Sequence, residues 1–367
     1  MISSVLVKPA GPDCNLRCNY CFYRQKAGMF DGKTHRMSDE ILETLIRDAM
    51  RLGICTFSWQ GGEPVLMGLD FFKKVVALEV EYGLPGTSVA NALQTNGTLL
   101  DHEWAEFLAE YRFLVGLSID GPAKLHDAYR RDRQGKPTHQ RVMDSAKLLR
   151  ESGVEFNVLA LINDVNVGRA DALYDFLIQN EIYFMQFVPC IEPGGKGMPA
   201  PFSITPEDFG TFLVRMFDRW VENFPDVSIR DFDDLLLRAV GRTPGTCTVS
   251  QRCGSYVVVE HNGDAFACDF FVTSRWRLGN IMETPLQEIV ECEQLERFAG
   301  AKGEVGKACK RCAYLDRCCG GCQKHRTVLG GKLTDPSYFC KAYKMLFAHA
   351  EPVVPELADR LREMGRA

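Results

Sequence analysis

Eleven of the fifteen cysteines in this chain of 367 residues fall into three groups with regular spacing. The first group is CNLRCNYC at 14–21, with the spacing C-x3-C-x2-C, and two further groups follow after residue 245. The N-terminal sequence lacks the charged and apolar regions of a signal peptide, so a secreted, disulfide-linked protein is not expected. Clustered cysteines in a reducing compartment more often bind metal or do redox work. The sequence therefore predicts a cytoplasmic metal-binding protein.

The overall composition excludes two classes of partner. The net charge is −5 with acidic and basic residues interspersed, so no basic face indicates binding to nucleic acid. No apolar run approaches the roughly 20 residues of a membrane span, so no membrane partner is expected. The 46% apolar fraction is enough for a large core and for two domains.

The first half of the chain alternates short apolar runs with amphipathic helical patterns. Six runs predict strands, at 4–8, 55–59, 88–94, 113–119, 156–162 and 184–188. Helical patterns cover 38–52, where Ser38 is the expected N-cap, and 102–111. Six β-then-α units predict a parallel sheet and are too few for a closed eight-stranded barrel. The expected fold is α/β, a partial (β/α)6 barrel with its chemistry at the C-terminal strand ends.

The chain changes character after residue 190. A Pro/Gly-rich connection at 192–209 precedes a helical pattern at 212–224, and residues 245–345 are dense in cysteine and turns. We expect this last segment to depend on bound metal more than on an apolar core. The predicted domains are 1–235 for the partial barrel with its linker, 236–345 for a cysteine-rich domain, and 346–367 for a C-terminal helix.

The first cysteine group has three members where most metal sites use four. Cys14, Cys18 and Cys21 follow the first predicted strand. Three thiolates can hold three irons of a 4Fe–4S cluster and leave the fourth iron open to a small molecule. Structural zinc closes its tetrahedron with four ligands, and ferredoxins use four cysteines per cluster. A zinc site completed by a distant histidine, such as His35, is the alternative.

The same loop resembles that of the radical S-adenosylmethionine (AdoMet) enzymes. Tyr20 stands just before the third cysteine, and SWQGGEP at 58–64, which ends the second predicted strand, is similar to the family's GGEP motif. The resemblance implies that AdoMet chelates the open iron and is cleaved to a 5′-deoxyadenosyl radical. It also implies that the backbone of this motif and Glu63 receive the AdoMet amino group. Gly61 and Gly62 let the main chain approach a ligand closely.

The resemblance also carries over the family's contacts with small molecules. The implied AdoMet contacts are Tyr20, Gly62, Glu63, Ser118, Arg130 and Ile191. Arg131 is almost as plausible as its neighbour Arg130. Tyr23 and Gln60 are expected to face the opening of the active site, at the C-terminal strand ends, and to touch the substrate.

The later cysteines resemble the SPASM extension, which binds two auxiliary 4Fe–4S clusters through cysteine alone. The resemblance implies two sets of four ligands. The nearer set, for the cluster closer to the substrate, is Cys247, Cys253, Cys268 and Cys322, and the farther set, for the other cluster, is Cys309, Cys312, Cys318 and Cys340. Cys319 can replace Cys318 by a slip of one residue, but Cys318 keeps the x5 spacing. A zinc ribbon at C309-x2-C312 is the alternative for part of this pattern.

Almost the whole chain is similar to the anaerobic sulfatase-maturating enzymes. The similar stretches include KPAGPDCNLRCNYCFYR, FSWQGGEPVLMGLDFF, LQTNGTLLD, FLVGLSIDGP, CDFFVTSRWRLGNI and CCGGC. The resemblance implies oxidation of a Cys or Ser side chain, in a C/S-x-P-S/A-R segment of a sulfatase polypeptide, to formylglycine. It further implies three 4Fe–4S clusters, AdoMet, and a flavodoxin or ferredoxin as electron donor.

The resemblance assigns the proton acceptor to Asp269, next to Cys268. An ordinary Asp lies about 4.5 pKa units below a thiol, so proton transfer is uphill by roughly 6 kcal/mol. We expect burial of the carboxylate to make Asp269 a stronger base and to narrow this gap.

The alternative function is a SPASM maturase that modifies a ribosomally synthesised peptide by thioether formation, epimerisation or crosslinking. Many such maturases begin with a leader-peptide-binding domain, and the 13 residues before Cys14 are too few for one.

Overall fold

The computed structural model describes residues 2–365, which divide into two compact units. The first unit comprises Met1–Ser118, Tyr129–Phe156 and Gly254–Ala299. The second unit comprises Ile119–Ala128, Asn157–Cys253 and Gly300–Ala367. Each unit therefore combines segments that are far apart in the sequence.

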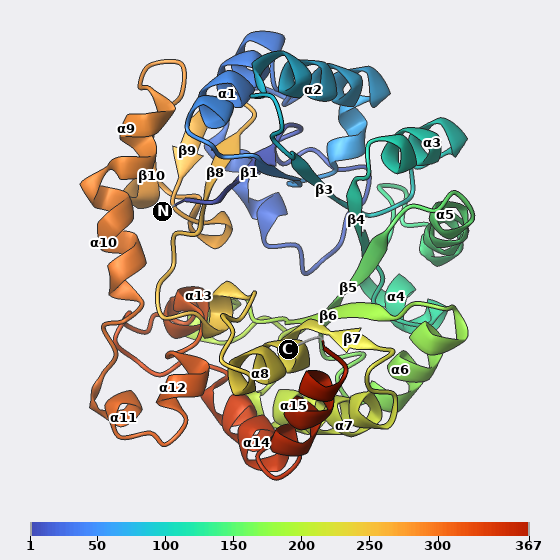
Figure 1. The fold of residues 1–367 in the computed structure, drawn as a ribbon, viewed down its shortest axis with the longest axis vertical. Coiled ribbons are helices and arrows are strands. Elements are labelled where there is room, and N and C mark those ends of the chain that lie inside the picture. Colours follow the sequence, from blue (N-terminus) through green and yellow to red (C-terminus); the bar gives the residue numbers. More distant parts are fainter. Residues whose placement is uncertain (1, 366–367) are drawn as a thin grey trace. The chain divides into compact units, whose positions relative to one another are not determined.

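The first unit is built on seven strands, shown in Figure 1. They are β1 (Ser4–Lys8), β2 (Thr56–Trp59), β3 (Ala90–Thr95), β4 (Leu114–Ser118), β8 (Tyr256–Glu260), β9 (Asp264–Phe266) and β10 (Arg277–Asn280). Strands β1 to β4 pair in parallel in chain order, and β8 pairs in parallel with the other side of β1. Strands β9 and β10 continue antiparallel from β8.

The helices of the first unit connect these strands or follow the last of them along the chain. They are α1 (Asp39–Arg51), α2 (Leu69–Tyr82), α3 (His102–Glu110), α5 (His139–Glu151), α9 (Leu286–Glu291) and α10 (Glu293–Ala301), with short 3-10 helices η1 (Tyr23–Met29), η2 (Pro64–Met67), η5 (Asp269–Phe271) and η6 (Ser274–Trp276). Helix α1 begins as predicted, because the Ser38 hydroxyl accepts a hydrogen bond from the Ile41 amide at 3.3 Å.

The second unit contains three strands and a larger share of helix. Its strands are β5 (Phe156–Ile162), β6 (Phe184–Pro189) and β7 (Ser228–Ile229), all parallel. Its helices are α4 (Ala123–Tyr129), α6 (Ala170–Gln179), α7 (Pro206–Glu222), α8 (Arg230–Ala239), α11 (Lys307–Lys310), α12 (Leu315–Cys318), α13 (Gln323–Thr327), α14 (Cys340–Ala350) and α15 (Val354–Glu363), with η3 (Gly195–Gly197) and η4 (Cys247–Val249).

The predicted α/β class is confirmed, and the strands form no closed barrel within residues 2–365. All six predicted strands are present as β1 to β6, with ends that shift by two residues at most. The C-terminal stretch holds α14 and α15, with Pro352 between them, and residues 366–367 of the predicted last helix lie outside the described residues. No helix of the described residues is long and apolar enough to cross a membrane.

The expectation that the cysteine-rich segment has little apolar core is wrong for residues 256–280. These residues supply β8, β9 and β10, which complete the sheet of the first unit. Val257, Val258 and Val259 of β8 are fully buried, and Val258 packs in a cluster with Leu6 of β1. The burial of this apolar strand against β1 stabilises the segment through the hydrophobic effect.

Three polar side chains are linked by hydrogen bonds in the core between α2 and the sheet. The Trp59 indole nitrogen donates to the Asn91 side-chain oxygen at 2.8 Å, and the Asn91 amide donates to the carboxylate of Glu79. Glu79 is 6% exposed, and burial raises its pKa to about 7, although the bond from Asn91 opposes this shift.

Replacing Glu79 by Gln should therefore change how stability depends on pH. Since the folded-state pKa is raised, the unmodified protein loses stability as pH rises from about 4.5 through about 7. Glu79→Gln cannot ionise, so its stability relative to the unmodified protein should improve by about 2–3 kcal/mol between pH 5 and pH 8. Urea denaturation at both pH values measures this change. Glu81→Gln, at an exposed position of the same helix, is the control and should show no such trend.

Candidate active site

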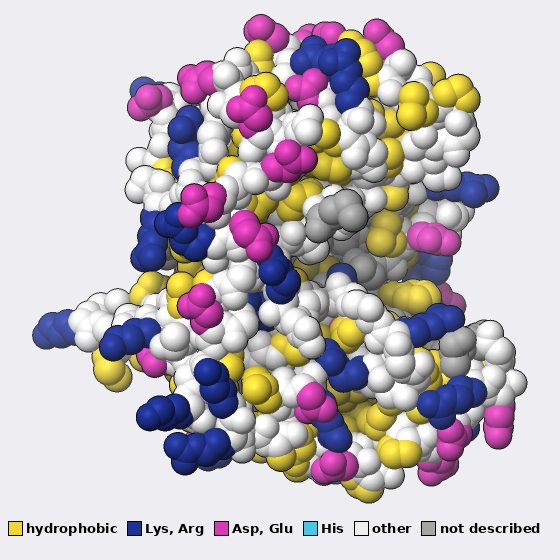
Figure 2. Space-filling view, turned by 60° about the vertical axis from the view of Figure 1, so that its left-hand side comes forward, with side chains coloured by type: hydrophobic (Ala, Val, Ile, Leu, Met, Phe, Trp, Pro, Cys, Tyr) yellow, Lys and Arg dark blue, Asp and Glu magenta, His cyan; other side chains and the backbone are white. Residues whose placement is uncertain are grey.

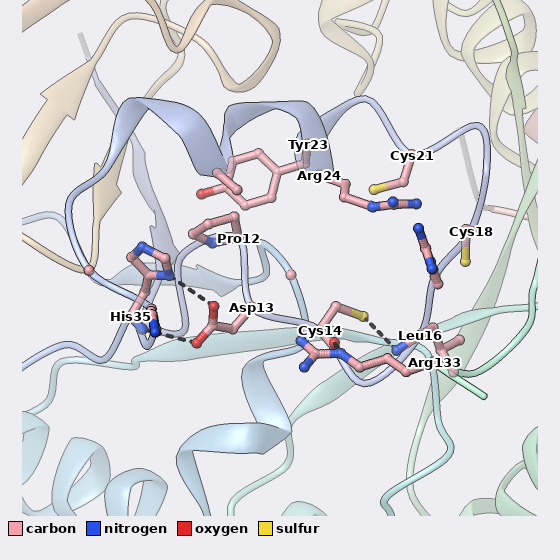
Figure 3. Close-up of a pocket in the computed structure, with 15 residues that line it drawn as sticks. Pro12, Asp13, Cys14, Leu16, Cys18, Cys21, Tyr23, Arg24, His35 and Arg133 are labelled. Carbon is pink, nitrogen blue, oxygen red and sulfur yellow. Dashed lines mark hydrogen bonds and ion pairs between the residues drawn. The ribbon is translucent and has the colours of Figure 1, made fainter.

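The three cysteines of the first group surround one cavity at the C-terminal end of β1. Cys14, Cys18 and Cys21 line a space of about 480 Å³, and Figure 3 shows their thiols around it. Burial raises the pKa of the Cys14 thiol to about 12, and the nearby charge of Glu63 adds to this shift. A bound cation stabilises the thiolate that this environment otherwise disfavours. The donor set therefore fits the iron–sulfur cluster that the spacing predicts.

Polar groups hold the first cysteine in place. The Leu16 amide donates to the Cys14 sulfur at 3.3 Å, and the Asn96 side chain donates to it at 3.7 Å. The Arg133 guanidinium donates to the Cys14 carbonyl at 2.8 Å. Hydrogen bonds to ligand sulfurs tune cluster potentials, so these contacts suit a redox centre.

The GGEP motif packs against this loop through its backbone. The Gly62 amide donates to the Gly11 carbonyl at 2.8 Å, and the Glu63 amide donates to the Asp13 carbonyl at 2.7 Å. A Cβ atom at Gly62 would lie 1.9 Å from that same Asp13 oxygen, so only glycine fits. Gly62 also lines the cysteine cavity, and its contact with AdoMet stays a prediction.

The Glu63 side chain points into the core of the first unit. Its carboxylate accepts hydrogen bonds from the Thr95 hydroxyl at 2.8 Å, the Asn96 amide at 2.8 Å and the Val65 amide at 3.1 Å. Burial raises the Glu63 pKa to about 7, and these bonds partly offset the shift. The carboxylate thus ties η2 to the end of β3. Its contact with the AdoMet amino group remains a prediction.

Two of the expected AdoMet contacts lie side by side. The Arg130 guanidinium stands 5.6 Å from the centroid of the buried Tyr20 ring, and Tyr129 packs edge-on against the same ring. Arg131 is exposed and donates to the Gly135 carbonyl at 2.9 Å. The structure therefore favours Arg130 over Arg131 for an AdoMet contact.

The remaining predicted contacts lie at strand ends. Ser118 ends β4, and its hydroxyl accepts a hydrogen bond from Gln94 at 3.1 Å. Gln60 follows β2 directly, and its amide donates to the Val7 carbonyl at 2.9 Å. Ile191, in the second unit, follows β6 and is fully buried. The roles of these residues stay predictions.

Asp269 forms an ion pair with Lys8, at the end of β1. Lys8 is 1% exposed and Asp269 is 13% exposed. The role of Asp269 as proton acceptor stays a prediction. Two further contacts fix the loop after Cys268: Phe270 packs on Phe22 with ring centroids 4.9 Å apart, and Lys26 donates to the Val272 carbonyl at 3.0 Å.

Sequence reasoning missed two charged residues at this site. Lys8 and Glu260 are the last residues of β1 and β8, and each follows a run of buried apolar residues. The Tyr23 hydroxyl donates to the Glu260 carboxylate at 2.5 Å, and Tyr23 is buried and lines the cysteine cavity. A charged residue that ends an otherwise apolar strand is the signal that identifies both positions.

The farther auxiliary set comes together in the second unit. Four cysteines line one small cavity of about 20 Å³ with the rings of Tyr314, Tyr343 and Phe347, namely Cys309, Cys312, Cys318 and Cys340. Cys319 has a left-handed backbone with φ 48° and lines a different hollow. Its sulfur faces the Asp316 carbonyl at 3.7 Å. The structure therefore favours Cys318 as the ligand.

Three members of the nearer set also lie in the second unit. Cys247, Cys253 and Cys322 are close enough for their charges to interact, and burial raises the Cys253 pKa to about 11. The buried Lys302 ammonium donates to the Cys247 carbonyl. Cys268 lies in the first unit, where its sulfur is 3.5 Å from the Tyr256 hydroxyl. Its place in this set stays a prediction.

No three His, Cys, Asp or Glu side chains in residues 2–365 converge as ligands of a single metal ion do. The cysteines of a 4Fe–4S cluster each bind a different iron, so they stand farther apart than the ligands of one ion.

Comparison with known proteins identifies the class of this site. Residues 9–177 match the model of the radical SAM superfamily, and residues 247–313 match that of the SPASM iron–sulfur cluster-binding domain. The matches cover the first cysteine group and most of the later ones. The chain is thus a radical AdoMet enzyme, and its cofactors are AdoMet and three 4Fe–4S clusters.

Relatives over nearly the full length define the family. The Cys-type anaerobic sulfatase-maturating enzyme of Clostridium perfringens is 36% identical over 98% of this chain and 99% of its own length. The Ser-type enzyme of Bacteroides thetaiotaomicron is 38% identical over 97% of this chain and 91% of its own length. The solved structure of native anSMEcpe with bound AdoMet and Cp18Cys peptide superposes with a TM-score of 0.90 at 36% identity, covering 98% of this chain and 99% of that one. The chain belongs to the anaerobic sulfatase-maturating enzymes.

Iron content distinguishes the two adjacent cysteines. Cys318→Ala should lose the farther auxiliary cluster, so that iron falls from about twelve to about eight atoms per chain. Cys319→Ala should keep about twelve, because its sulfur is outside the cavity that the other four share. Iron and sulfide are measured on protein purified without oxygen. Loss of iron in Cys319→Ala alone would assign the ligand to Cys319.

Proposed function

We propose that this chain oxidises a Cys or Ser side chain in a C/S-x-P-S/A-R segment of a sulfatase polypeptide to formylglycine. The observation that carries this proposal is the near-complete similarity to enzymes of both the Cys type and the Ser type. The site geometry supports it, because an ionisable carboxylate, Asp269, lies in the first unit together with the cavity of the three cysteines.

Separate groups of residues bind the AdoMet cluster and the nucleotide. Cys14, Cys18 and Cys21 hold the cluster that binds AdoMet, while the backbone at Gly62 and the Tyr20–Arg130 pair border the nucleotide. When bound, AdoMet and its cluster would supply the radical that removes one hydrogen atom from the substrate β-carbon, and the two auxiliary clusters would accept the second electron.

Asp269 accepts the proton of the substrate thiol or hydroxyl. For a Cys substrate, loss of that proton together with one hydrogen atom and one electron leaves a thioaldehyde. Water then replaces sulfur to give the aldehyde and hydrogen sulfide. An ordinary carboxylate is a weak base for a thiol, so the carbon radical must acidify the neighbouring S–H group. Tyr23 and Gln60 contact the substrate in this scheme.

We infer that the electron donor is a flavodoxin or a ferredoxin. Four exposed cationic side chains line the cavity of the first cysteine group: Arg17, Arg24, Lys33 and Arg133. On the face that Figure 2 shows, Lys and Arg side chains are interspersed with Asp and Glu side chains. A local excess of positive charge steers a small acidic electron carrier toward the cluster.

An anoxic assay with two peptides tests the function. Peptides that contain C-x-P-S-R and S-x-P-S-R are incubated with enzyme, AdoMet and dithionite and then weighed by mass spectrometry. Conversion lowers the mass by roughly 18 units for Cys and roughly 2 for Ser, from the atoms exchanged at the side chain. Cleavage of AdoMet without a mass change in either peptide would contradict the proposal and favour a ribosomal-peptide substrate.

Charge reversal tests the inferred donor. Arg17→Glu combined with Lys33→Glu should slow AdoMet cleavage about tenfold with reduced flavodoxin, because the acidic carrier loses its complementary surface. The rate with dithionite should stay within about twofold. Arg51→Glu, at the exposed end of α1, is the control. Equal rates with both reductants would contradict docking at this cavity.

A further inference from the structure

Two opposite charges are buried side by side in the sheet of the first unit. Lys8 of β1 and Glu260 of β8 are paired in the register of these parallel strands. Lys8 is 1% exposed and Glu260 is 0% exposed. Buried charges are costly unless a counter-charge lies close by, so two ionisable side chains at this depth need an explanation beyond stability.

The Lys8 ammonium is held on several sides. It lies 3.5 Å from the centroid of the Tyr23 ring and 5.9 Å from that of Phe22, where the ring faces attract a cation. The stem is covered by Gly61, since a Cβ atom there would lie 3.2 Å from the Lys8 Cβ. The only carboxylate within ion-pair distance of the ammonium in residues 2–365 is Asp269. Lys8 thus has one defined orientation.

Glu260 completes the arrangement behind Tyr23. Its Oε2 accepts the Tyr23 hydrogen bond at 2.5 Å, while its Oε1 is buried without a hydrogen-bond partner among the described residues. Burial raises the Glu260 pKa to about 7, and the Lys8 charge opposes this shift. Glu260 therefore fixes the Tyr23 ring on which the ammonium rests.

We propose that Lys8 is a positioning residue for Asp269, and that Tyr23 and Glu260 position Lys8 in turn. The ammonium holds the carboxylate in one orientation, so that a free oxygen faces the thiol or hydroxyl of the substrate. This inference rests on the proposed function, in which Asp269 is the proton acceptor. A base displaced by about 1 Å loses much of its effect on the reaction.

The chemical consequence is coupling between two events. Once a hydrogen atom has left the substrate carbon, the proton must leave promptly for the oxidation to continue. With Asp269 misplaced, AdoMet is still cleaved, but fewer cleavage events end in formylglycine. Lys8 therefore affects the yield per AdoMet more than the binding of the peptide.

The experiment measures 5′-deoxyadenosine and formylglycine peptide in the same reaction with dithionite as reductant. In Lys8→Met, which keeps the aliphatic stem and removes the charge, the ratio of the two products should rise at least tenfold. The KM for the peptide should change less than threefold. Lys8→Arg should restore part of the coupling because it returns a cation to the site.

A double variant separates positioning from a general loss of structure. If Lys8 acts through Asp269, Lys8→Met combined with Asp269→Asn should lose no more formylglycine activity than Asp269→Asn alone. If the loss of formylglycine activity in the double variant equals the product of the losses in the two single variants, the proposal is overturned. Iron content and the unfolding temperature of each variant report on structure directly. If Lys8→Met does not load its clusters, Lys8→Arg takes its place in the same cycle.

Two controls complete the test. Lys74→Met removes the ion pair with Asp39 at the surface of the same unit and should leave the product ratio unchanged. If Lys8→Met keeps the product ratio of an active parent enzyme, the proposed role of Lys8 is overturned and the proposed function is not. A parent enzyme that converts neither peptide would instead overturn the proposed function and this inference with it.

Discussion

The contact between Gly62 and the Asp13 carbonyl is the junction on which the site depends. It brings the turn after β2 into backbone contact with the loop after β1, immediately before Cys14. Glu63, the next residue, extends the junction to β3 through Thr95 and Asn96. The ends of three parallel strands are thus fixed to one another by the chain's own hydrogen bonds. A cluster held by the three predicted cysteine ligands would need this rigidity, because no fourth side chain would orient it.

Electrostatics divides the site into two kinds of environment. At the cysteine cavity, burial disfavours the free thiolate of Cys14, and a bound iron cluster would remove that disadvantage. At the end of β1, by contrast, the chain supplies its own counter-charges, with Lys8 between Asp269 and the Tyr23 ring. The first environment favours a neutral thiol unless a cation binds, whereas the second is organised by protein alone.

The sequence allowed most local features to be predicted and few of the long-range ones. The strands β1 to β6 were visible because each is a compact apolar run followed by a helical pattern, and the Ser38 cap was visible because capping depends on adjacent residues. Cys14, Cys18 and Cys21 were visible through spacing alone. Strand β8 was missed because YVVVE lies among turns and cysteines, and its partner β1 is about 250 positions away. The inward direction of Glu63 was missed because a motif shows which residues occur together and not where each side chain points.

The pairing of β1 with β8 makes the two halves of the sequence interdependent. Without β8, one side of β1 would present unpaired amide and carbonyl groups and the buried faces of Val5 and Val7, a surface prone to aggregation. Lys8 would also lose the neighbour that keeps the Tyr23 ring in place. A fragment that ends before residue 236 is therefore an incomplete fold rather than a smaller enzyme, because β8, β9 and β10 complete the sheet that contains β1.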